Sequence, residues 1–408
     1  MKFGYKDTEA CLVPEEWEVR ELRELVTFLD GKRRPVRSSD RAKIRGSIPY
    51  YGASGIVDYV NDYIFDDELI LLGEDGENIL SRNLPLAFRI SGKAWVNNHA
   101  HVLKPNPDIS IGFLTEYLES LNYETLNSGT AQPKLNKKKC SSILVAVPPQ
   151  VEQRAIAEAL SDVDALLGAL DRLIAKKLDL KQAAMQQLLT GQTRLPGFQG
   201  MWEEKRLGDL GVTYGGLTGK TKADFGAGEA RYITFMNVMA NVIINCATFA
   251  RVTVRPTESQ NVARKGDLFF NGSSETPEEV AMCSVLLEEV QGVYLNSFCF
   301  GFRFREGADA DGLFLAYYMR GPKGRELMKS LAQGSTRYNL SKVALLNLAL
   351  RLPMPSEQAA IAGALREMDL ELAGLERRRE KTLALKQGMM QELLTGRTRL
   401  VTPESAHA

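Results

Sequence analysis

The chain has 408 residues, more than one compact core usually holds, so we expect two domains of roughly 150 residues each. Hydrophobic residues make up 44% of the chain and charged residues 25%, which excludes wholesale disorder. Lys plus Arg and Asp plus Glu number 51 each, which excludes a uniformly basic nucleic-acid coat and leaves room for local basic patches.

The N-terminal segment has no apolar signal core, and no apolar stretch approaches membrane-spanning length, so a cytoplasmic location is expected. Reduced structural thiols are expected as well, because the cysteines are odd in number and lack pair spacing. They are Cys11, Cys140, Cys246, Cys283 and Cys299.

The first region, residues 1–149, has short apolar runs such as 68–72 and 95–96, separated by Gly, Asn, Asp and Pro. This texture predicts a mixed, β-rich domain with a few helices. Basic residues gather near its start and its end, where they are either phosphate contacts or a solvated charged face. The candidates for DNA contact are Lys32, Arg33, Arg34, Arg37, Lys134 and Lys137.

The loop before the last apolar run of this region mixes hydroxyl, amide and cationic side chains, with Thr130, Gln132 and Asn136 as further DNA-contact candidates. Gln132 has the donor and acceptor pair that reads adenine. The alternative is a turn that caps the helix or strand that follows, and the two roles are compatible. His99 and His101 could lie on one face of a strand, but His407 is the one other histidine, so no metal site is expected.

A long amphipathic helix is predicted from Val151, between Pro148-Pro149 and Gly191. Its apolar residues step by three and four and form one seam, which predicts a helical partner. The seam residues are Leu160, Val163, Leu167, Leu170 and Ile174.

The second β-rich region, residues 196–354, contains Gly215 to Thr221, which resembles a phosphate-binding loop. That motif requires glycine where Tyr214 stands, so nucleotide binding is not expected. A loop near its end parallels the loop of the first region, and its arginine has the geometry to read guanine. The DNA-contact candidates of this region are Lys220, Lys222, Ser335, Thr336, Arg337, Tyr338, Asn339 and Lys342.

The second helical region repeats the first, since residues 152–195 reappear as 357–400 with 25 of 44 positions identical. We expect the two helices to pair as an antiparallel coiled coil that separates two similar domains. In the second copy 377–380 is charged where apolar contacts are expected, so either weaker helix pairing or a contact with a partner protein is expected there. Its seam residues are Leu365, Met368, Leu372, Leu375 and Leu383.

The chain resembles the specificity subunits of Type I restriction–modification systems from Trp17 to Leu400, most specifically in 152–157, 181–186 and 189–194 and in their second copies. The resemblance implies an α+β fold with a pseudo-twofold internal repeat. It divides the chain into a first target recognition domain (1–149), a first helical spacer (150–195), a second recognition domain (196–354), a second spacer (355–400) and a tail (401–408).

The same resemblance implies that each recognition domain reads one half of a split double-stranded DNA site and that the helices dock two methyltransferase subunits and restriction (translocase) subunits. Those partners would use S-adenosylmethionine, ATP and Mg, whereas this chain would bind no cofactor and catalyse nothing by itself. This fits the sequence, in which we find no base-methylation or nucleotide-hydrolysis motif. The alternatives are a coiled-coil scaffold with paired protein-binding domains and an ATP-binding enzyme that uses Lys220.

Overall fold

The computed structural model describes residues 4–8, 12–129 and 132–401. The chain divides into two compact units, residues 1–172 with 377–408 and residues 173–376. Thr130 and the tail from residue 402 lie outside the described residues.

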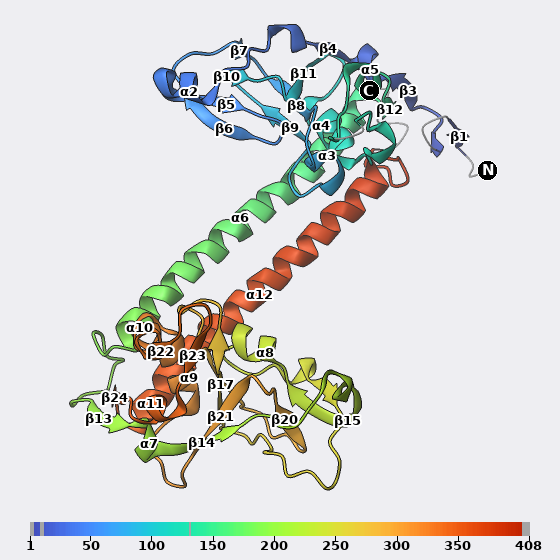
Figure 1. Cartoon of the computed structure of the whole chain (residues 1–408). Coiled ribbons are helices and arrows are strands. Elements are labelled where there is room, and N and C mark those ends of the chain that lie inside the picture. The colour runs from blue at the N-terminus through green and yellow to red at the C-terminus, as the bar shows by residue number, and fades with distance from the viewer. Residues whose placement is uncertain (1–3, 9–11, 130–131, 402–408) are drawn as a thin grey trace. The chain divides into compact units, whose positions relative to one another are not determined.

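The first unit is built on an antiparallel sheet in the order β4-β11-β8-β9 (Figure 1). Its strand β8 is apolar throughout and buried on both faces. Ile70 and Leu72 enter one core together with helical residues, while Leu69 and Leu71 enter a second core. This follows from the two-residue period of a strand. The strands are β4 (Val26–Phe28), β11 (Ala100–Pro105), β8 (Leu69–Gly73) and β9 (Ala87–Ile90).

A second sheet, in the order β6-β5-β10-β7, completes the first unit together with short helices and turns. Its strands are β5 (Arg45–Tyr51), β6 (Ile56–Val60), β7 (Phe65–Asp66) and β10 (Lys93–Val96). The remaining strand pairs are β1 (Tyr5–Asp7) with β2 (Leu12–Pro14) and β3 (Glu18–Glu21) with β12 (Leu144–Val147). The short helices are α1 (Leu22–Leu25), α2 (Ser38–Arg41), α3 (Asn78–Ser81), α4 (Ile111–Ser120), α5 (Lys137–Ser141), η1 (Asp30–Lys32), η2 (Ala42–Ile44) and η3 (Glu124–Leu126).

The second unit repeats this plan, with a central sheet in the order β14-β21-β17-β19 and a second sheet in the order β16-β15-β20. Leu268 and Phe270 of β17 face the helical core, and Phe269 between them faces the other core. The strands of these sheets are β14 (Gly211–Gly215), β21 (Cys299–Phe304), β17 (Leu268–Asn271), β19 (Cys283–Val285), β15 (Phe225–Ile233), β16 (Ala250–Val252) and β20 (Val293–Leu295).

A three-stranded sheet in the order β18-β23-β22 is added in the second unit. Its strands are β18 (Ser273–Ser274), β22 (Ala332–Gln333) and β23 (Tyr338–Leu340), and β13 (Glu203–Arg206) pairs with β24 (Ala349–Leu352). The short helices are α7 (Leu207–Leu210), α8 (Phe235–Ala240), α9 (Gly312–Arg320), α10 (Pro322–Leu331), α11 (Lys342–Leu346), η4 (Lys222–Asp224) and η5 (Cys246–Thr248).

The two long helices, α6 (Gln150–Leu188) and α12 (Pro355–Leu393), have 39 residues each, and each contributes to both units. In the first unit Lys386 pairs with Asp164 at 2.8 Å and Arg379 with Asp171 at 2.5 Å. In the second unit Lys177 pairs with Glu371, and Lys181 with Asp369. Within each unit the residue number rises on one helix as it falls on the other, so the helix segments there run antiparallel.

Most seam residues of the two long helices are buried or half-buried. Leu160, Leu170, Leu365 and Leu372 are buried. Val163, Leu167, Ile174, Met368 and Leu375 are half-buried. At the end of the second seam the pattern differs from expectation, because Leu383 is 41% exposed and its neighbour Thr382 is buried. Thr382 is satisfied there by donating its hydroxyl to the Arg378 carbonyl at 2.8 Å.

The charged stretch at 377–380 finds a partner on α6, since Arg379 meets Asp171. No helix in the described part of the chain is long and apolar enough to cross a membrane. The prediction of two mixed, β-rich domains within an α+β fold and a duplicated plan is confirmed, whereas a full coiled coil stays a prediction.

Candidate nucleic-acid interface

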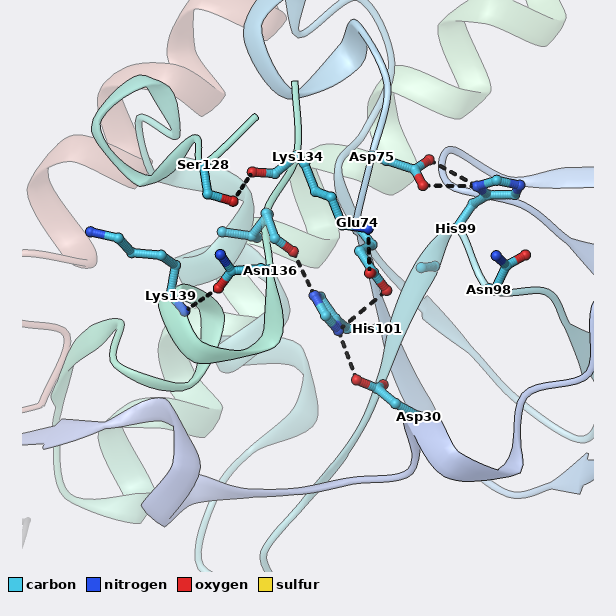
Figure 2. Close-up of polar contacts among 12 residues, drawn as sticks. Asp30, Glu74, Asp75, Asn98, His99, His101, Ser128, Lys134, Asn136 and Lys139 are labelled. Carbon is cyan, nitrogen blue, oxygen red and sulfur yellow. Dashed lines mark hydrogen bonds and ion pairs between the residues drawn. The ribbon is translucent and has the colours of Figure 1, made fainter. Parts of the chain in front are cut away.

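Four segments of the first unit that are far apart in sequence meet at the His101 side chain (Figure 2). His101 lies on β11 and is 1% exposed. Its Nδ1 lies 2.8 Å from Asp30 Oδ2 in the turn after β4, and its Nε2 lies 2.8 Å from the carbonyl oxygen of Leu135. Leu135 in turn donates its backbone N–H to the carbonyl of Glu74 at 2.7 Å. The imidazole therefore ties the loop at 132–136 to the central sheet.

Glu74 is the second centre of this cluster. Its carboxylate accepts a hydrogen bond from Arg33 Nη1 at 2.7 Å and lies 3.3 Å from Lys134 Nζ. Burial alone would raise the pKa of Glu74, but Arg33, His101 and Lys134 outweigh it and lower that pKa. Arg33 also donates to the Ala100 carbonyl at 2.7 Å. Arg33, a DNA-contact candidate from the sequence, is thus a half-buried part of the framework.

Around this framework the cationic candidates face solvent. Lys32, Arg34, Arg37, Gln132, Lys134 and Lys137 are exposed. Asn136 does what the capping alternative predicted, because its side chain accepts from the Lys139 N–H at 2.9 Å at the start of α5. Lys137 Nζ lies 5.2 Å from the centre of the Phe28 ring. The surface thus combines exposed cations and the Gln132 amide around the cluster of Arg33, Glu74 and His101.

The second unit builds the same connection with different side chains. Asn271 lies opposite Cys299 as Gly73 lies opposite Ala100 in the first unit. Leu340 donates its N–H to the Gly272 carbonyl at 3.0 Å, and this bond matches the bond from Leu135 to Glu74. In the place of His101 stands Phe300, which stacks on Phe270 with ring centres 5.4 Å apart.

The loop between β22 and β23 carries three candidates of the second unit, and three more follow on β23 and at the start of α11. Gly334 has φ +128, and a Cβ there would lie 2.1 Å from the Arg337 carbonyl oxygen, so the tight loop requires glycine. Ser335, Thr336, Arg337, Asn339 and Lys342 are exposed, and Tyr338 is half-buried. Arg337 lies 5.9 Å from the centre of the exposed Phe298 ring, and Lys342 lies 5.6 Å from that of Phe300.

The Gly215 to Thr221 segment does not present its lysine to solvent. The Lys220 side chain is 2% exposed, pairs with Glu258 and donates to the Thr253 carbonyl at 2.6 Å. Lys222, two residues on, is exposed. Of these two candidates Lys222 is the accessible one.

His99 pairs with Asp75 at 2.9 Å and is half exposed. No group of three or more His, Cys, Asp or Glu within the described ranges could hold a metal ion. Cys140, Cys246, Cys283 and Cys299 are free thiols, and burial raises the pKa of Cys246 to about 11 and that of Cys283 to about 12.

Sequence reasoning missed Asp30, Glu74 and the buried role of His101. It also missed why the repeats begin with Glu-Gln. Glu152 is fully buried and accepts from Arg399 Nε at 2.6 Å and from Trp17 Nε1 at 3.0 Å. Gln153 accepts from the Ser110 N–H at 2.8 Å. The recurrence of a polar Glu-Gln pair at the start of both helices was the signal that could have revealed the role of this pair.

Comparison with known proteins agrees with this geometry. The chain matches the family described as "Type I restriction modification DNA specificity domain" twice, at residues 14–178 and 200–385. A Haemophilus influenzae protein described as a type I restriction enzyme specificity subunit is 36% identical over 166 residues, which cover 41% of this chain and 42% of that protein.

Two further relatives span nearly the whole chain. The Type I restriction enzyme MjaVIII specificity subunit of Methanocaldococcus jannaschii is 24% identical over 428 residues, which cover 97% of this chain and 96% of that protein. The crystal structure of a Type-I restriction-modification system S subunit from M. genitalium superposes with a TM-score of 0.59 at 15% identity, over 92% of this chain and 96% of that one.

The two matches to the family model place this chain in a class of DNA specificity proteins, with the family's domain present twice in this chain. The chain belongs to the Type I restriction–modification DNA specificity family, as a specificity subunit that is a non-catalytic component of its system. The resemblance seen in the sequence is thus confirmed, and the scaffold hypothesis is not favoured.

Proposed function

We propose that this chain gives a Type I restriction–modification complex its DNA sequence specificity, with each recognition domain reading one half of a bipartite double-stranded DNA site. The loops that include 132–139 and 333–342 would contact the DNA. The observation that carries the proposal is that one backbone connection is built twice beneath loops with different exposed side chains, notably Gln132 in one and Arg337 in the other. Two domains that share a fold but expose different side chains fit two different half-sites.

Exposed cations would supply the sequence-independent part of binding. In the first unit they are Lys32, Arg34, Arg37, Lys134 and Lys137, and in the second Lys222, Arg337 and Lys342. Residues 1–149 and 196–354 would be the recognition domains, and 150–195 and 355–400 the spacers that dock two methyltransferase subunits and the restriction subunits. The partners would use S-adenosylmethionine, ATP and Mg, and the complex would act in the cytoplasm.

The test is single-molecule sequencing of methylated adenines in cells that co-express this chain with the methyltransferase subunits of a Type I system that assemble with it. Exchanging residues 1–149 for the matching domain of a relative should change one half of the methylated motif and leave the other half intact. Cells without this chain are the control. A motif that is unchanged, or changed in both halves, would contradict the assignment of one half-site to each domain.

Binding to duplex DNA gives an independent check. Affinity should fall steeply with salt, because phosphate contacts release counterions. An assembled complex that binds no duplex at low salt would refute the proposal.

A further inference from the structure

An exposed aromatic ring lies beside the loop at 333–342 of the second unit. Phe298, in the turn between β20 and β21, is 61% exposed. The guanidinium of Arg337 in that loop lies 5.9 Å from the centre of the Phe298 ring. Single exposed apolar side chains are common on protein surfaces. The position of Phe298 is nevertheless particular, because the same backbone bonds build it in both units.

Three hydrogen bonds connect Phe298 to the loop. Its N–H donates to Asn296 Oδ1 at 2.9 Å, and its carbonyl accepts the Gly272 N–H at 2.8 Å. The Gly272 carbonyl in turn accepts the N–H of Leu340 at 3.0 Å. Phe298 contributes backbone atoms alone to these bonds, so the turn does not require its side chain.

The first unit repeats these bonds at His99. The His99 N–H donates to Asn97 Oδ1 at 2.8 Å, and its carbonyl accepts the Glu74 N–H at 2.8 Å. The Glu74 carbonyl accepts the N–H of Leu135 at 2.7 Å. His99 and Phe298 therefore occupy equivalent positions, and both are exposed. Each unit thus presents one exposed ring at the same point beside its loop.

The two rings differ in the side chain that they contact. The imidazole of His99 lies 2.9 Å from Asp75 in the first unit (Figure 2). Ser273 takes the place of Asp75 in the second unit, since each pairs with the loop strand beside it. The Phe298 ring instead lies against Arg337, for which no carboxylate partner occurs among the described residues.

The ring of Phe298 holds Arg337 without occupying its hydrogen-bond donors. A cation is attracted to the face of an aromatic ring by the charge distribution of the ring, and no N–H donor is consumed. Arg33 of the first unit, by contrast, donates to Glu74 at 2.7 Å. Arg337 therefore keeps the donors that a bidentate contact with guanine requires.

We propose that Phe298 reads a base of the second half-site, with its ring packed against the methyl group of a thymine next to the guanine that Arg337 reads. Apolar side chains recognise thymine through this methyl group in the major groove. The 5.9 Å between the guanidinium and the ring centre exceeds one base-pair step of about 3.4 Å but is less than two, which fits neighbouring base pairs. This inference rests on the function proposed above.

Packing against a methyl group is favoured over insertion of the ring between two base pairs. Insertion unstacks a base step and places a base on each side of the wedge. Arg337 already lies over the Phe298 ring, so one face is taken. The ring is left with one face and its edge for contact with DNA.

The methylated motif gives the first test. Exchange of one recognition domain identifies the half of the motif that residues 196–354 read. That half should contain a G·C pair directly beside an A·T pair. A second half-site without this step would overturn the proposal.

The decisive test removes single methyl groups from the DNA. The assembled complex with its methyltransferase subunits is titrated with fluorescent duplexes in which each thymine of the second half-site is replaced in turn by uracil, which lacks the methyl group. At one position the parent chain should bind the uracil duplex about fourfold more weakly, the effect of one buried methyl group. Phe298→Ala should bind the two duplexes equally. Equal uracil sensitivity in the parent chain and in Phe298→Ala would overturn the proposal.

The readout is the ratio of affinities for two duplexes, which loss of folded protein does not change. His99→Ala, the matched change in the first unit, should leave the uracil effect in the second half-site as it is in the parent chain. Loss of the effect in both variants would contradict the assignment of this contact to Phe298.

The neighbouring guanine can be located in the same way. Replacement of that guanine by 7-deazaguanine, which lacks the N7 acceptor, should weaken binding by the parent chain about tenfold and should have no effect in Arg337→Gln. The guanine that depends on Arg337 should lie directly beside the thymine that depends on Phe298. Positions two or more base pairs apart would overturn the paired contact.

The outcomes separate this inference from the proposed function. A complex that binds no duplex at low salt would refute both. Sequence-specific binding in which no thymine depends on Phe298 would refute this inference alone.

Discussion

The two units hold equivalent loops by opposite means. In the first, a buried polar cluster of Asp30, Glu74 and His101 ties the loop to the sheet. In the second, Phe300 stacks on Phe270, and the loop is extended into the paired strands β22 and β23. A backbone connection can therefore be preserved while its support changes from polar side-chain contacts to apolar stacking and strand pairing.

The helix ends show the converse, since there the side chains themselves are kept. Glu152 pairs with Arg399 in the first unit, and Glu357 pairs with Arg194 in the second. Both carboxylates are fully buried. The two units thus share the Glu–Arg pairs at the helix ends, which we call the constant part, and differ in the side chains that support and form the outward-facing loops.

The largest effect is expected from breaking the constant part. Arg399→Met should lower the free energy of unfolding of the first unit by about 3 kcal/mol, because it leaves a buried carboxylate without its cation. Arg194→Met should destabilise the second unit more, because Glu152 keeps Trp17 whereas no second donor to Glu357 occurs among the described residues. Hydrogen exchange at the first turns of α6 and α12 reports each unit separately, and equal losses would contradict the difference.

A smaller effect should distinguish the two tryptophans. Trp17 Nε1 donates to Glu152 at 3.0 Å, whereas Trp202 Nε1 is buried and has no acceptor in the described part of the chain. Trp17→Phe should therefore cost about 2 kcal/mol more unfolding free energy than Trp202→Phe, which removes the same volume. Urea unfolding monitored by hydrogen exchange measures both, and Trp202→Phe is the matched control.

The helices and the internal repeat could be predicted from sequence, because they follow from local periodicity and from the identity of the two copies, and the antiparallel sense was expected because such a pair separates two similar domains. Asn136 could be placed as a cap for the same reason. The cluster around His101 could not, because it joins residues from 30 to 135 through tertiary contacts that no spacing encodes. Arg33 and Lys220 were predicted as surface cations for the same reason. In the structure Arg33 pairs with Glu74, and Lys220 pairs with Glu258.

A third comparison concerns α4 in the first unit and α9 in the second, each of which contacts a long helix. Glu116 of α4 and Tyr317 of α9 each meet a Lys–Asp pair, Lys386 with Asp164 and Lys181 with Asp369. Burial raises the pKa of Glu116, although Lys386 opposes the shift. The folded chain then favours the protonated acid, so this contribution to stability is full below about pH 4.5 and is lost as pH rises through the raised pKa.

Glu116→Gln should therefore raise the unfolding free energy of the first unit at neutral pH and flatten its pH dependence. Tyr317→Phe should lower the unfolding free energy of the second unit by about 1 kcal/mol at both acidic and neutral pH, because it removes the 2.6 Å hydrogen bond to Asp369. Thermal unfolding followed across pH tests both, and a destabilised Glu116→Gln at neutral pH would show that the Lys386 pair dominates.

The smallest effect should come from two matched cations, Lys137 and Lys342, which begin α5 and α11 and lie over aromatic rings. Both are exposed, so Gln at either place should change stability by no more than about 0.5 kcal/mol. If each lysine contacts a phosphate, each substitution should weaken binding to all duplexes alike and lower the slope of log affinity against log salt by about one. A change in preference at one base pair would instead make that lysine a base reader, and an unchanged slope would place it outside the interface.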